Sequence, residues 1–261
     1  MRNLHQSARG LWRPLLVGVL FAAFTLAVYA ALSRRASRIT ELVVEIQPTP
    51  TGLFFIQRQD VERRLDAGPQ GVLIGENIEA VRLEPLERFL RRDPFVAEAD
   101  LYTGYDGRLH VTIRQREPLL RVHHRRGPDY YLGPGGEVLP LSKHDVARVP
   151  VLTGDVPPFA DAAADSLAID AFALARRLGD DALLGALVEQ IEVKDGVYTL
   201  VPKLGSAVVT LGTLEDLDDK LARLHTFLRG AVPEVGWDAY HSIDLTYDKQ
   251  VVCRKKTTPS A

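Results

Sequence analysis

Residues 96–114, VAEADLYTGYDGRLHVTIR, decide the fold of the region that surrounds them. Apolar and acidic side chains alternate over residues 97–101, and apolar and polar side chains alternate over residues 109–113. A period of two is typical of a strand with one buried face, and the glycines within residues 104–107 favour a turn. The stretch therefore predicts two antiparallel strands that place one face of a sheet against a core.

The residues before this stretch predict one more strand and two helices. Residues 39–47, ITELVVEIQ, are β-branched and apolar enough for a strand. The spacing of apolar residues predicts a helix over residues 56–67 and a second helix from about Leu83. The order over residues 39–117 is thus β-α-α-β-β, an α+β arrangement in which two helices cover a three-stranded sheet.

Residues 15–32, LLVGVLFAAFTLAVYAAL, contain no charged side chain. As a helix this stretch is about 27 Å long, close to the roughly 30 Å hydrocarbon core of a bilayer, so we expect a transmembrane helix. A cleaved signal peptide is the alternative, but Arg34 and Arg35 follow where a small-residue cleavage site would be expected. The expected membrane-anchor residues are Leu15, Leu20, Phe21, Phe24, Leu26 and Leu32.

The charges on the two sides of this span leave its orientation open. Three arginines precede the span and three follow it closely, so the positive-inside rule does not choose a side. Large domains are translocated largely regardless of charge, so the residues after the span can lie on either side of the membrane.

The composition is that of an ordinary globular protein and argues against nucleic-acid binding. Of the 261 residues, 46% are hydrophobic and 25% are charged, and the formal net charge is -2. Lys and Arg are interspersed with Asp and Glu, so there is no basic footprint. With Cys253 as the single cysteine of the sequence, neither an intrachain disulfide nor a multi-cysteine zinc site can form.

The rest of the chain predicts a second domain that is rich in strands. Turn-forming residues 133–136 separate two strand-like runs, and Asp195-Gly196 separates two more, because Asp-Gly favours the turn that matches strand twist. Apolar residues at helical spacing predict a helix over residues 164–178, with Gly179 as its end. The predicted strands are residues 129–132, 137–139, 191–193, 197–201 and 208–211.

The last predicted elements are an amphipathic helix and a strand. Thr213 and Asp216 form a capping-box-like start, leucines then recur at helical spacing, and Gly230 ends the helix. Apolar and polar residues alternate over residues 243–247, which predicts a final strand that continues through Val252. With no element after it, this strand would be a sheet edge. Its N–H and C=O groups either accept a strand of another chain or are protected by charge.

The sequence shows no pattern of a catalytic, cofactor-binding or metal-binding site. Adjacent histidines at 123–124 would point to opposite faces of a strand and so would not converge on one metal ion. Residues 133–136 lack the Lys and Ser/Thr of a phosphate-binding loop. The carboxylate pairs at 180–181 and 218–219 are expected to be solvated charges. We therefore expect no enzymatic activity, no cofactor and no metal.

Several stretches share their order and spacing with one known family. They are RDPFVAEADLYTGYDGRLHVTIRQREPLLRV (92–122), YYLGPGGEVLPL (130–141), ARVPVLTG (147–154), the Lys220-Leu221 pair and IDLTY (243–247). Together with the single span, this series resembles the FtsQ family of bacterial cell-division proteins, also called DivIB. The resemblance covers nearly the whole chain.

The resemblance implies a POTRA domain followed by a second, β-rich domain with helices. The implied boundaries are a cytoplasmic tail at 1–14, a transmembrane helix at 15–32, the POTRA domain at 33–117, the β domain at 118–253 and a C-terminal tail at 254–261. It also implies a single-pass protein of the cell inner membrane at the division septum, with its C-terminal domains in the periplasm.

The resemblance further implies a non-enzymatic divisome scaffold that links early and late division proteins and supports septal peptidoglycan synthesis. FtsQ proteins bind FtsB, with FtsL, by β-augmentation at the final strand, where Tyr247 would be an aromatic anchor and residues 254–256 would meet acidic groups. The implied partner-binding residues are Thr246, Tyr247, Asp248, Lys249, Gln250, Val251 and Val252. Gly133, where the family often has Asp, and residues 116–118 depart from the family pattern, which leaves the register of the partner strand open.

Two other functions remain open at this point. A membrane-anchored POTRA protein that chaperones or transports polypeptides would need a channel partner. A membrane-tethered hydrolase would need a catalytic site that no motif in the sequence reveals. The division phenotype on depletion distinguishes the scaffold from the polypeptide chaperone.

Overall fold

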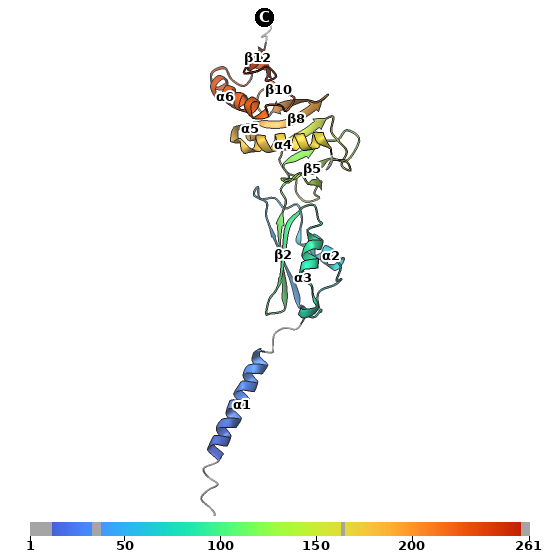
Figure 1. Cartoon of the computed structure of the whole chain (residues 1–261), viewed down its shortest axis with the longest axis vertical. Helices are drawn as coiled ribbons and strands as arrows, with labels where there is room; N and C mark the ends of the chain where they lie inside the picture. The colour runs from blue at the N-terminus through green and yellow to red at the C-terminus, as the bar shows by residue number, and fades with distance from the viewer. Residues whose placement is uncertain (1–11, 33–37, 163–164, 257–261) are drawn as a thin grey trace, which may run out of the picture.

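The computed structural model describes residues 12–32, 38–162 and 165–256 (Figure 1). Most of the predicted N-terminal tail, and the last five residues of the predicted C-terminal tail, lie outside these ranges. The described residues form a helix, α1, and two folded domains that lie in line (Figure 1).

Helix α1 covers Trp12–Leu32, the region of the predicted anchor. Within the residues that the structure describes, no helix meets both the length and the apolarity needed to cross a membrane. The side chains of Leu15 and Leu32 lie outside the described residues. The other predicted anchor residues are exposed on α1, namely Leu20, Phe21, Phe24 and Leu26. Membrane anchoring therefore stays a prediction.

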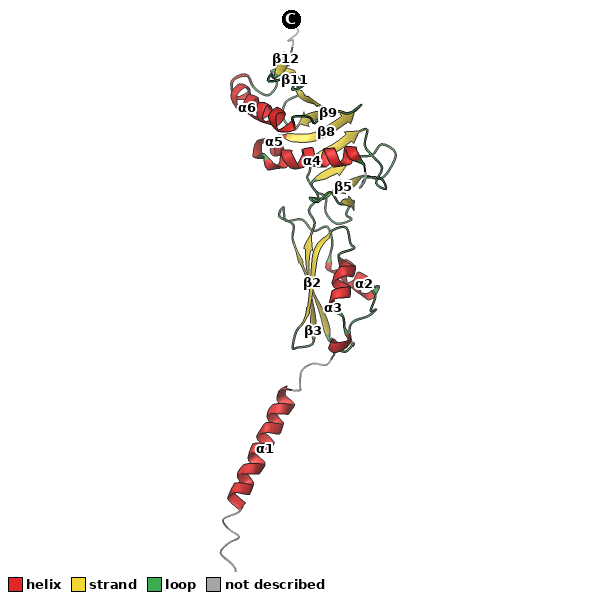
Figure 2. Ribbon diagram, viewed as in Figure 1, coloured by secondary structure: helices red, strands yellow, loops and turns green. Residues whose placement is uncertain are grey.

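The first domain has the predicted β-α-α-β-β order. Its elements are β1 Glu41–Gln47, α2 Arg58–Asp66, the short 3-10 helix η1 Ile78–Ala80, α3 Leu83–Leu90, β2 Val96–Thr103 and β3 Arg108–Gln115. The strand order is β1-β3-β2, with β1 parallel and β2 antiparallel to β3. Helix α2 contacts β1, α3 contacts β2, and the two helices contact each other, so both cover one face of the sheet (Figure 2).

The apolar residues at helical spacing are the ones that face this sheet. Val61 and Leu65 are buried on α2, and Leu86 and Leu90 are buried on α3, in one core with the strands. Full burial of one such side chain contributes about 1.5–3 kcal/mol. The layer of two helices over three strands was thus predictable from periodicity.

A β-bulge at the start of β2 is a feature that the alternation did not predict. The ladder register shifts between Val96 and Glu98. Val96 and Ala99 are both buried, whereas Ala97 is only half-buried. The predicted alternation over residues 97–101 is kept, since Glu98 and Asp100 are exposed while Ala99 and Leu101 are buried, and the bulge adds one residue at the start of the strand.

The second domain, within the described part of residues 118–256, is a mixed sheet of nine strands covered by helices. Its elements are β4 Leu120–Val122, β5 Tyr130–Leu132, β6 Val138–Pro140, β7 Val151–Gly154, α4 Ser166–Asp180, α5 Ala182–Leu187, β8 Val188–Lys194, β9 Val197–Pro202, β10 Val208–Gly212, α6 Leu217–Val235, β11 Tyr240–Asp244 and β12 Val252–Lys255. The strand order is β12-β11-β10-β9-β8-β7-β4-β5-β6. Helix α4 contacts both α5 and α6, so the helices form one layer (Figure 2).

The turn between β8 and β9 is the one that the sequence predicted. Asp195 and Gly196 have φ angles of 51° and 76°, both in the left-handed region. Two consecutive residues with positive φ form the turn type whose twist matches that of a hairpin. The prediction of a hairpin at this position is confirmed.

Helix boundaries in the second domain differ from the prediction at α4. The helix continues through Gly179 to Asp180. The Asp181 carboxylate then caps α5, because it accepts hydrogen bonds from the N–H groups of Leu183 (2.8 Å) and Leu184 (3.1 Å). Helix α5 and strands β4 and β7 were not predicted, since elements this short show no clear period.

Helix α6 begins and ends later than predicted. Asp216 has a left-handed φ of 52° and precedes the first helical residue, so Thr213 lies outside the helix. Gly230 does not end α6, which continues past Pro233 and buries Val232 against the core. The apolar contact of the last turn offsets the backbone hydrogen bond that the proline lacks.

The two domains share a common core at their junction. Tyr131, Leu139 and Ala147 of the second domain are buried in the apolar cluster of the first domain. These residues come from β5, β6 and the connection after β6. The architecture therefore changes near residue 117, but the apolar packing continues from one domain into the other.

Polar contacts add to this junction. Ser142 Oγ donates to the carbonyl of Phe55 (2.7 Å), and His144 Nε2 lies 2.7 Å from Asp60 Oδ2. Burial alone would raise the pKa of Asp60, but hydrogen bonds from the Gln57 N–H and from His144 outweigh this effect and lower it. The ionised Asp60 is thus the state that the junction favours.

Candidate functional site

The predicted single strand over residues 243–252 is wrong, because the chain forms a hairpin there. β11 ends at Asp244, and β12 begins at Val252 and pairs antiparallel with β11. Oδ1 of Asp244 accepts hydrogen bonds from Thr246 N–H (2.9 Å) and Thr246 Oγ1 (2.6 Å). This local turn competes with ladder pairing, so the chain leaves the sheet although the apolar alternation continues.

β12 is the terminal strand of the nine-stranded sheet, and its outer side pairs with no strand in the described part of the chain. The N–H of Lys256 donates to the carbonyl of Ala239, next to β11 (3.1 Å). Because N–H directions alternate along a strand, the N–H groups of Cys253 and Lys255 point away from β11. We call this outer side of residues 252–255 the open edge.

The structure places the implied partner-binding residues mostly beside the open edge and not in it. Thr246, Tyr247, Asp248, Lys249, Gln250 and Val251 form the connection between the two strands, and only Val252 lies in β12. Arg254 and Lys255, which the prediction assigned to the tail, belong to β12. The backbone donors Cys253 and Lys255 were not predicted from the sequence. Their strand has only four residues, two of them cationic, so apolar and polar side chains do not alternate along it.

Arg223 of α6 holds this connection in place. Its guanidinium donates to the carbonyls of Tyr247 (2.9 Å), Gln250 and Leu245 (3.4 Å), and Nε bonds Asp219 at 2.8 Å. The side chain is only 15% exposed, so its charge-assisted bonds are partly shielded from water. Helix α6 and the connection therefore form one preorganised surface.

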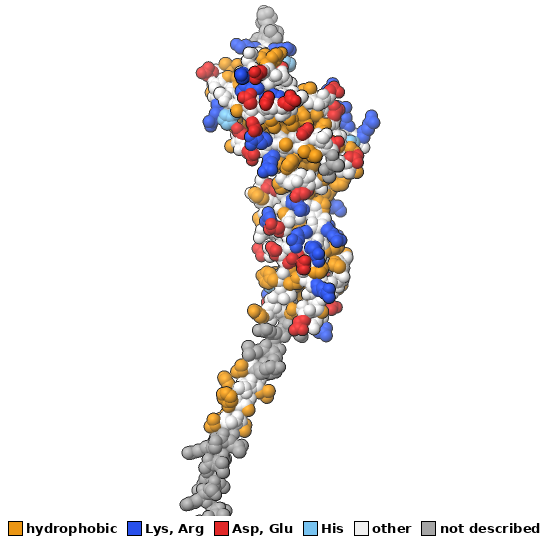
Figure 3. Space-filling model, in the orientation of Figure 1, with side chains coloured by type: hydrophobic (Ala, Val, Ile, Leu, Met, Phe, Trp, Pro, Cys, Tyr) orange, Lys and Arg blue, Asp and Glu red, His pale blue; other side chains and the backbone are white. Residues whose placement is uncertain are grey.

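The side chains around the open edge are apolar at one end and basic at the other. Tyr247 is 54% exposed and Val252 is 41% exposed. Arg254, Lys255 and Lys256 are also exposed, and basic side chains gather at this end of the second domain (Figure 3). Such a surface offers an aromatic anchor and a cationic rim to a partner.

The other side of the hairpin is fixed to the core. Val251 and Cys253 pack against the buried cluster of the second domain. The rings of Phe227 on α6 and Tyr240 on β11 are in contact, with centroids 5.5 Å apart. Burial raises the pKa of the Cys253 thiol, which keeps it neutral. The open edge is thus backed by a rigid layer.

The Lys220-Leu221 pair has a structural role next to this surface. Lys220 is buried, and its Nζ donates to the carbonyl of Thr213 at 2.8 Å. Leu221 is buried in the core of the second domain. Lys220 therefore ties the loop before α6 to the first turn of the helix, which the sequence pattern alone did not reveal.

Of the other residues considered from the sequence, the histidines at 123–124 have separate partners, whereas Asp180, Asp181 and Asp218 line one hollow with Arg177. His123 Nδ1 lies 2.9 Å from Asp129 Oδ1, and the ring of His124 accepts from the Arg126 N–H (3.3 Å). Among the described residues, no three His, Cys, Asp or Glu side chains are grouped so that they could hold a metal ion.

The carboxylates at 180–181 and 218–219 have protein partners, so they are not only solvated. Arg177 pairs with Asp180 and Asp218, and Asp219 pairs with Arg223. Asp181 caps α5 and bonds His225. Burial alone would raise the pKa of Asp181, but the Leu184 N–H and His225 outweigh burial and lower it.

Replacement of Arg223 by Ala is expected to loosen the connection between β11 and β12. Loss of its charge-assisted bonds should lower the free energy of unfolding by about 1–3 kcal/mol. In the wild type, the N–H of Gln250 donates to the carbonyl of Tyr247 at 3.4 Å. Hydrogen exchange of this amide should become faster in the variant. Urea denaturation and hydrogen exchange measure the two effects.

Asp219→Ala is the matched control for Arg223→Ala. It removes the exposed ion pair and leaves the bonds of Arg223 to the three carbonyls intact, so it should cost less than about 1 kcal/mol. Equal effects of the two variants would show that the carbonyl contacts do not hold the connection.

The fold of the first domain defines the class of this protein. Residues 39–114 match the POTRA-like domain, so the chain is a POTRA-containing protein with a second, strand-rich domain. Residues 117–254, more than half of the chain, match the family described as FtsQ/DivIB, C-terminal related. The chain belongs to the FtsQ/DivIB family, and the resemblance seen in the sequence is confirmed.

A curated relative supports this assignment. The cell division protein FtsQ of Rhodothermus marinus is 28% identical to the chain over 180 residues. The match covers 65% of this chain and 64% of that protein, which is slightly less than two thirds of the relative.

Proposed function

We propose that this chain is a non-enzymatic scaffold of the divisome that binds FtsB and FtsL and supports septal peptidoglycan synthesis. Membership of the FtsQ/DivIB family and the name of the curated relative support a role in cell division. Partner binding rests on one observation, the open edge with its two outward N–H groups. Arg223 holds the connection that leads into this strand.

In this proposal a strand of FtsB adds to β12 as the next strand of the sheet. Main-chain hydrogen bonds supply much of the affinity in strand addition, and neighbouring side chains supply specificity. Tyr247 covers the apolar part of the partner, and Arg254, Lys255 and Lys256 attract its acidic groups. Since Val251 and Cys253 are packed on the core, the edge is ordered before the partner arrives.

The proposal is tested by depletion of the protein from its host. Depleted cells should grow as filaments that fail to complete septa, while the export of periplasmic and outer-membrane proteins continues. Cell length and exported-protein levels are the measurements. Normal septation with defective export would contradict the scaffold and favour a POTRA protein that chaperones polypeptides.

We also propose that residues 15–32, which contain no charged side chain, anchor the chain in the inner membrane, with the two domains in the periplasm. In intact spheroplasts, a membrane-impermeant maleimide is then expected to label Cys253. The thiol is half-buried and its pKa is raised, so labelling should be slow near neutral pH and faster at pH about 9.

Ser206→Cys in a Cys253→Ser background is the control for this labelling. Ser206 is exposed in the loop between β9 and β10, so a cysteine there should react without the delay caused by burial. Labelling of both proteins only after lysis would place the domains on the cytoplasmic side.

A further inference from the structure

The first domain has an edge of its own, the outer side of β1. This side already accepts backbone pairing just before the strand begins. The N–H of Ile39 donates to the carbonyl of Glu76 (2.9 Å), and the N–H of Gly75 donates to the carbonyl of Ile39 (2.8 Å). Arg38 forms an antiparallel bridge with Asn77. The edge is therefore shaped to receive an antiparallel segment.

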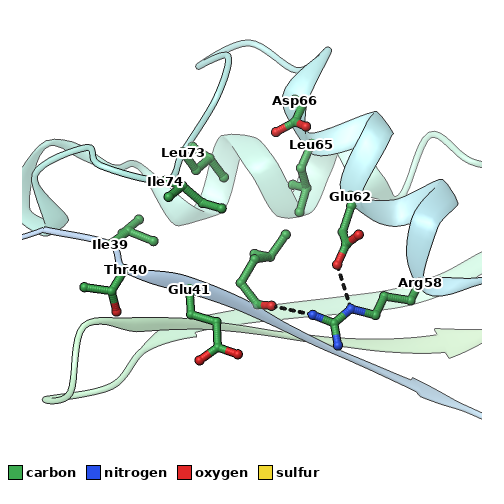
Figure 4. A pocket seen from close by; sticks show the side chains of 10 residues that line it. Ile39, Thr40, Glu41, Arg58, Glu62, Leu65, Asp66, Leu73 and Ile74 are labelled. Atoms are coloured by element: carbon green, nitrogen blue, oxygen red, sulfur yellow. Dashed lines mark hydrogen bonds and ion pairs between the residues drawn. The ribbon is translucent and has the colours of Figure 1, made fainter.

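Arg58 covers the next part of this edge. Its guanidinium donates to the carbonyl of Leu42 (3.0 Å), and Nε bonds Glu62 (2.6 Å), as Figure 4 shows. No strand of the described chain occupies this side of β1. The Arg58 side chain is 56% exposed, so it is a removable cover and not a part of the core.

Two hollows lie along the β1 edge, one on each side of Arg58. The first has a volume of about 280 Å³ and the second about 380 Å³. The first lies at residues 39–42 and the second at Val44 and Ile46. Their centres are thus about four residues apart along β1, or about 13 Å, and residues i and i+4 of a docked strand would face the same side.

The two hollows differ in chemistry. Ile39, Leu65, Leu73 and Ile74 give the first hollow apolar walls, while Glu62 and Asp66 lie on its helix side (Figure 4). A Lys or Arg side chain fits such a site, because its stem is apolar and its end is cationic.

The second hollow is lined by one carboxylate where the first is lined by three, and it extends to the second domain. Val44, Ile46, Phe54 and Ile56 contribute apolar side chains, and Phe54 is 40% exposed. Gln57 and Arg58 of the first domain, with His144 and Asp145 of the second domain, complete the lining. This hollow suits an uncharged side chain such as Leu, whose burial would contribute about 1.5–3 kcal/mol.

We propose that the β1 edge binds an extended segment of a partner protein that runs antiparallel to β1. An apolar residue of this segment occupies the second hollow, and a Lys or Arg four residues later occupies the first hollow, beside Glu62 and Asp66. The site lies in the other domain from the open edge of β12, so it is a second binding surface beyond the proposed function.

Arg58 has to leave the Leu42 carbonyl when the segment binds. An N–H of the segment replaces the guanidinium as donor, so binding exchanges one hydrogen bond for another at this carbonyl. In the free protein, Arg58 protects the edge against non-specific pairing. Removal of the arginine should therefore increase the affinity for a segment of the right chemistry.

The probes are two fluorescently labelled peptides, blocked at both ends. Each has Leu at one position and threonine elsewhere, and the residue four places after the Leu is Lys in one peptide and Glu in the other. Each peptide is titrated with the full chain, and binding is followed by fluorescence anisotropy. Hydrogen exchange measured by mass spectrometry identifies the protected backbone.

The Lys peptide is expected to bind more tightly than the Glu peptide, by at least about threefold, with protection of residues 41–47. The preference should disappear in Glu62→Gln/Asp66→Asn and persist in the control Asp100→Asn, which neutralises an exposed carboxylate on β2. Arg58→Ala should increase the affinity for the Lys peptide by about threefold.

Three outcomes would overturn the proposal. The first is equal binding of the two peptides. The second is protection from exchange at residues 252–255 and not at 41–47. The third is no change in anisotropy when the concentration of the full chain is raised to about 1 mM. Lys255→Pro, which removes an outward donor of the open edge, should leave peptide binding at β1 unchanged. This variant distinguishes a wrong proposal for the β1 edge from a wrong proposal for the open edge of β12.

Discussion

Lys255→Pro is expected to weaken binding of FtsB by at least about tenfold, or 1.4 kcal/mol. The N–H of Lys255 points away from β11, so proline removes a donor of the open edge without removing a ladder bond of the hairpin. The proline ring also occupies space that the added strand needs. Affinity measured with purified FtsB, and co-purification of the two proteins, give the result.

The matched control is Lys255→Ala, which removes the same charge and keeps the backbone donor. Loss of one exposed cation should reduce affinity only a few-fold and make binding less sensitive to salt. Both variants should melt within a few degrees of the wild type, because the side chain is exposed at a strand that ends the sheet. If the two variants bound FtsB equally well, strand addition at β12 would be the wrong mechanism.

Gly154→Ala is expected to destabilise the second domain by about 3 kcal/mol or more. Gly154 ends β7 with a φ of 97°, a conformation that an alanine rarely adopts. A Cβ at this position would overlap the carbonyl oxygen of Val193 and lie 2.9 Å from its carbonyl carbon. Because Gly154 and Val193 are paired backbone positions of β7 and β8, neither can move without loss of register.

Gly196→Ala separates backbone strain from this overlap. Gly196 also has a positive φ, 76°, but a Cβ there would meet nothing within 4 Å. Only the conformational cost remains, about 1–2 kcal/mol. The melting temperature should therefore fall by several degrees more in Gly154→Ala than in Gly196→Ala. Similar losses in both variants would contradict the steric explanation.

Sequence patterns predicted the first domain well because its elements are long enough to show a period. The strands before and after the 104–107 turn alternate over several residues, and helices α2 and α3 each present two buried residues four apart. The bulge at Val96 was not predictable, since it shifts the ladder without changing the residue types. Periodicity reports which residues are apolar, and not how the backbone accommodates them.

The candidate site was predicted only in part. The sequence located a free sheet edge near the C-terminus, which the structure also shows, but it placed the edge in the wrong residues. The error came from Asp244, whose carboxylate ends β11 by bonding Thr246 while the apolar alternation runs on to Tyr247. Arg223 was missed because its three carbonyl partners are 22 to 27 residues away in the chain.

The sheet of the second domain has a mechanical consequence. Its strands are stacked from β6, next to the first domain, to β12 at the far end, so the ladder hydrogen bonds lie roughly along the long axis of the two domains (Figure 1). A pull along this axis on a strand added at β12 would load the new hydrogen bonds one after another, as in a zipper, and not all at once as in shear. A partner held in this way should detach at low force when it is pulled away along the axis, and resist a pull that is parallel to the strands.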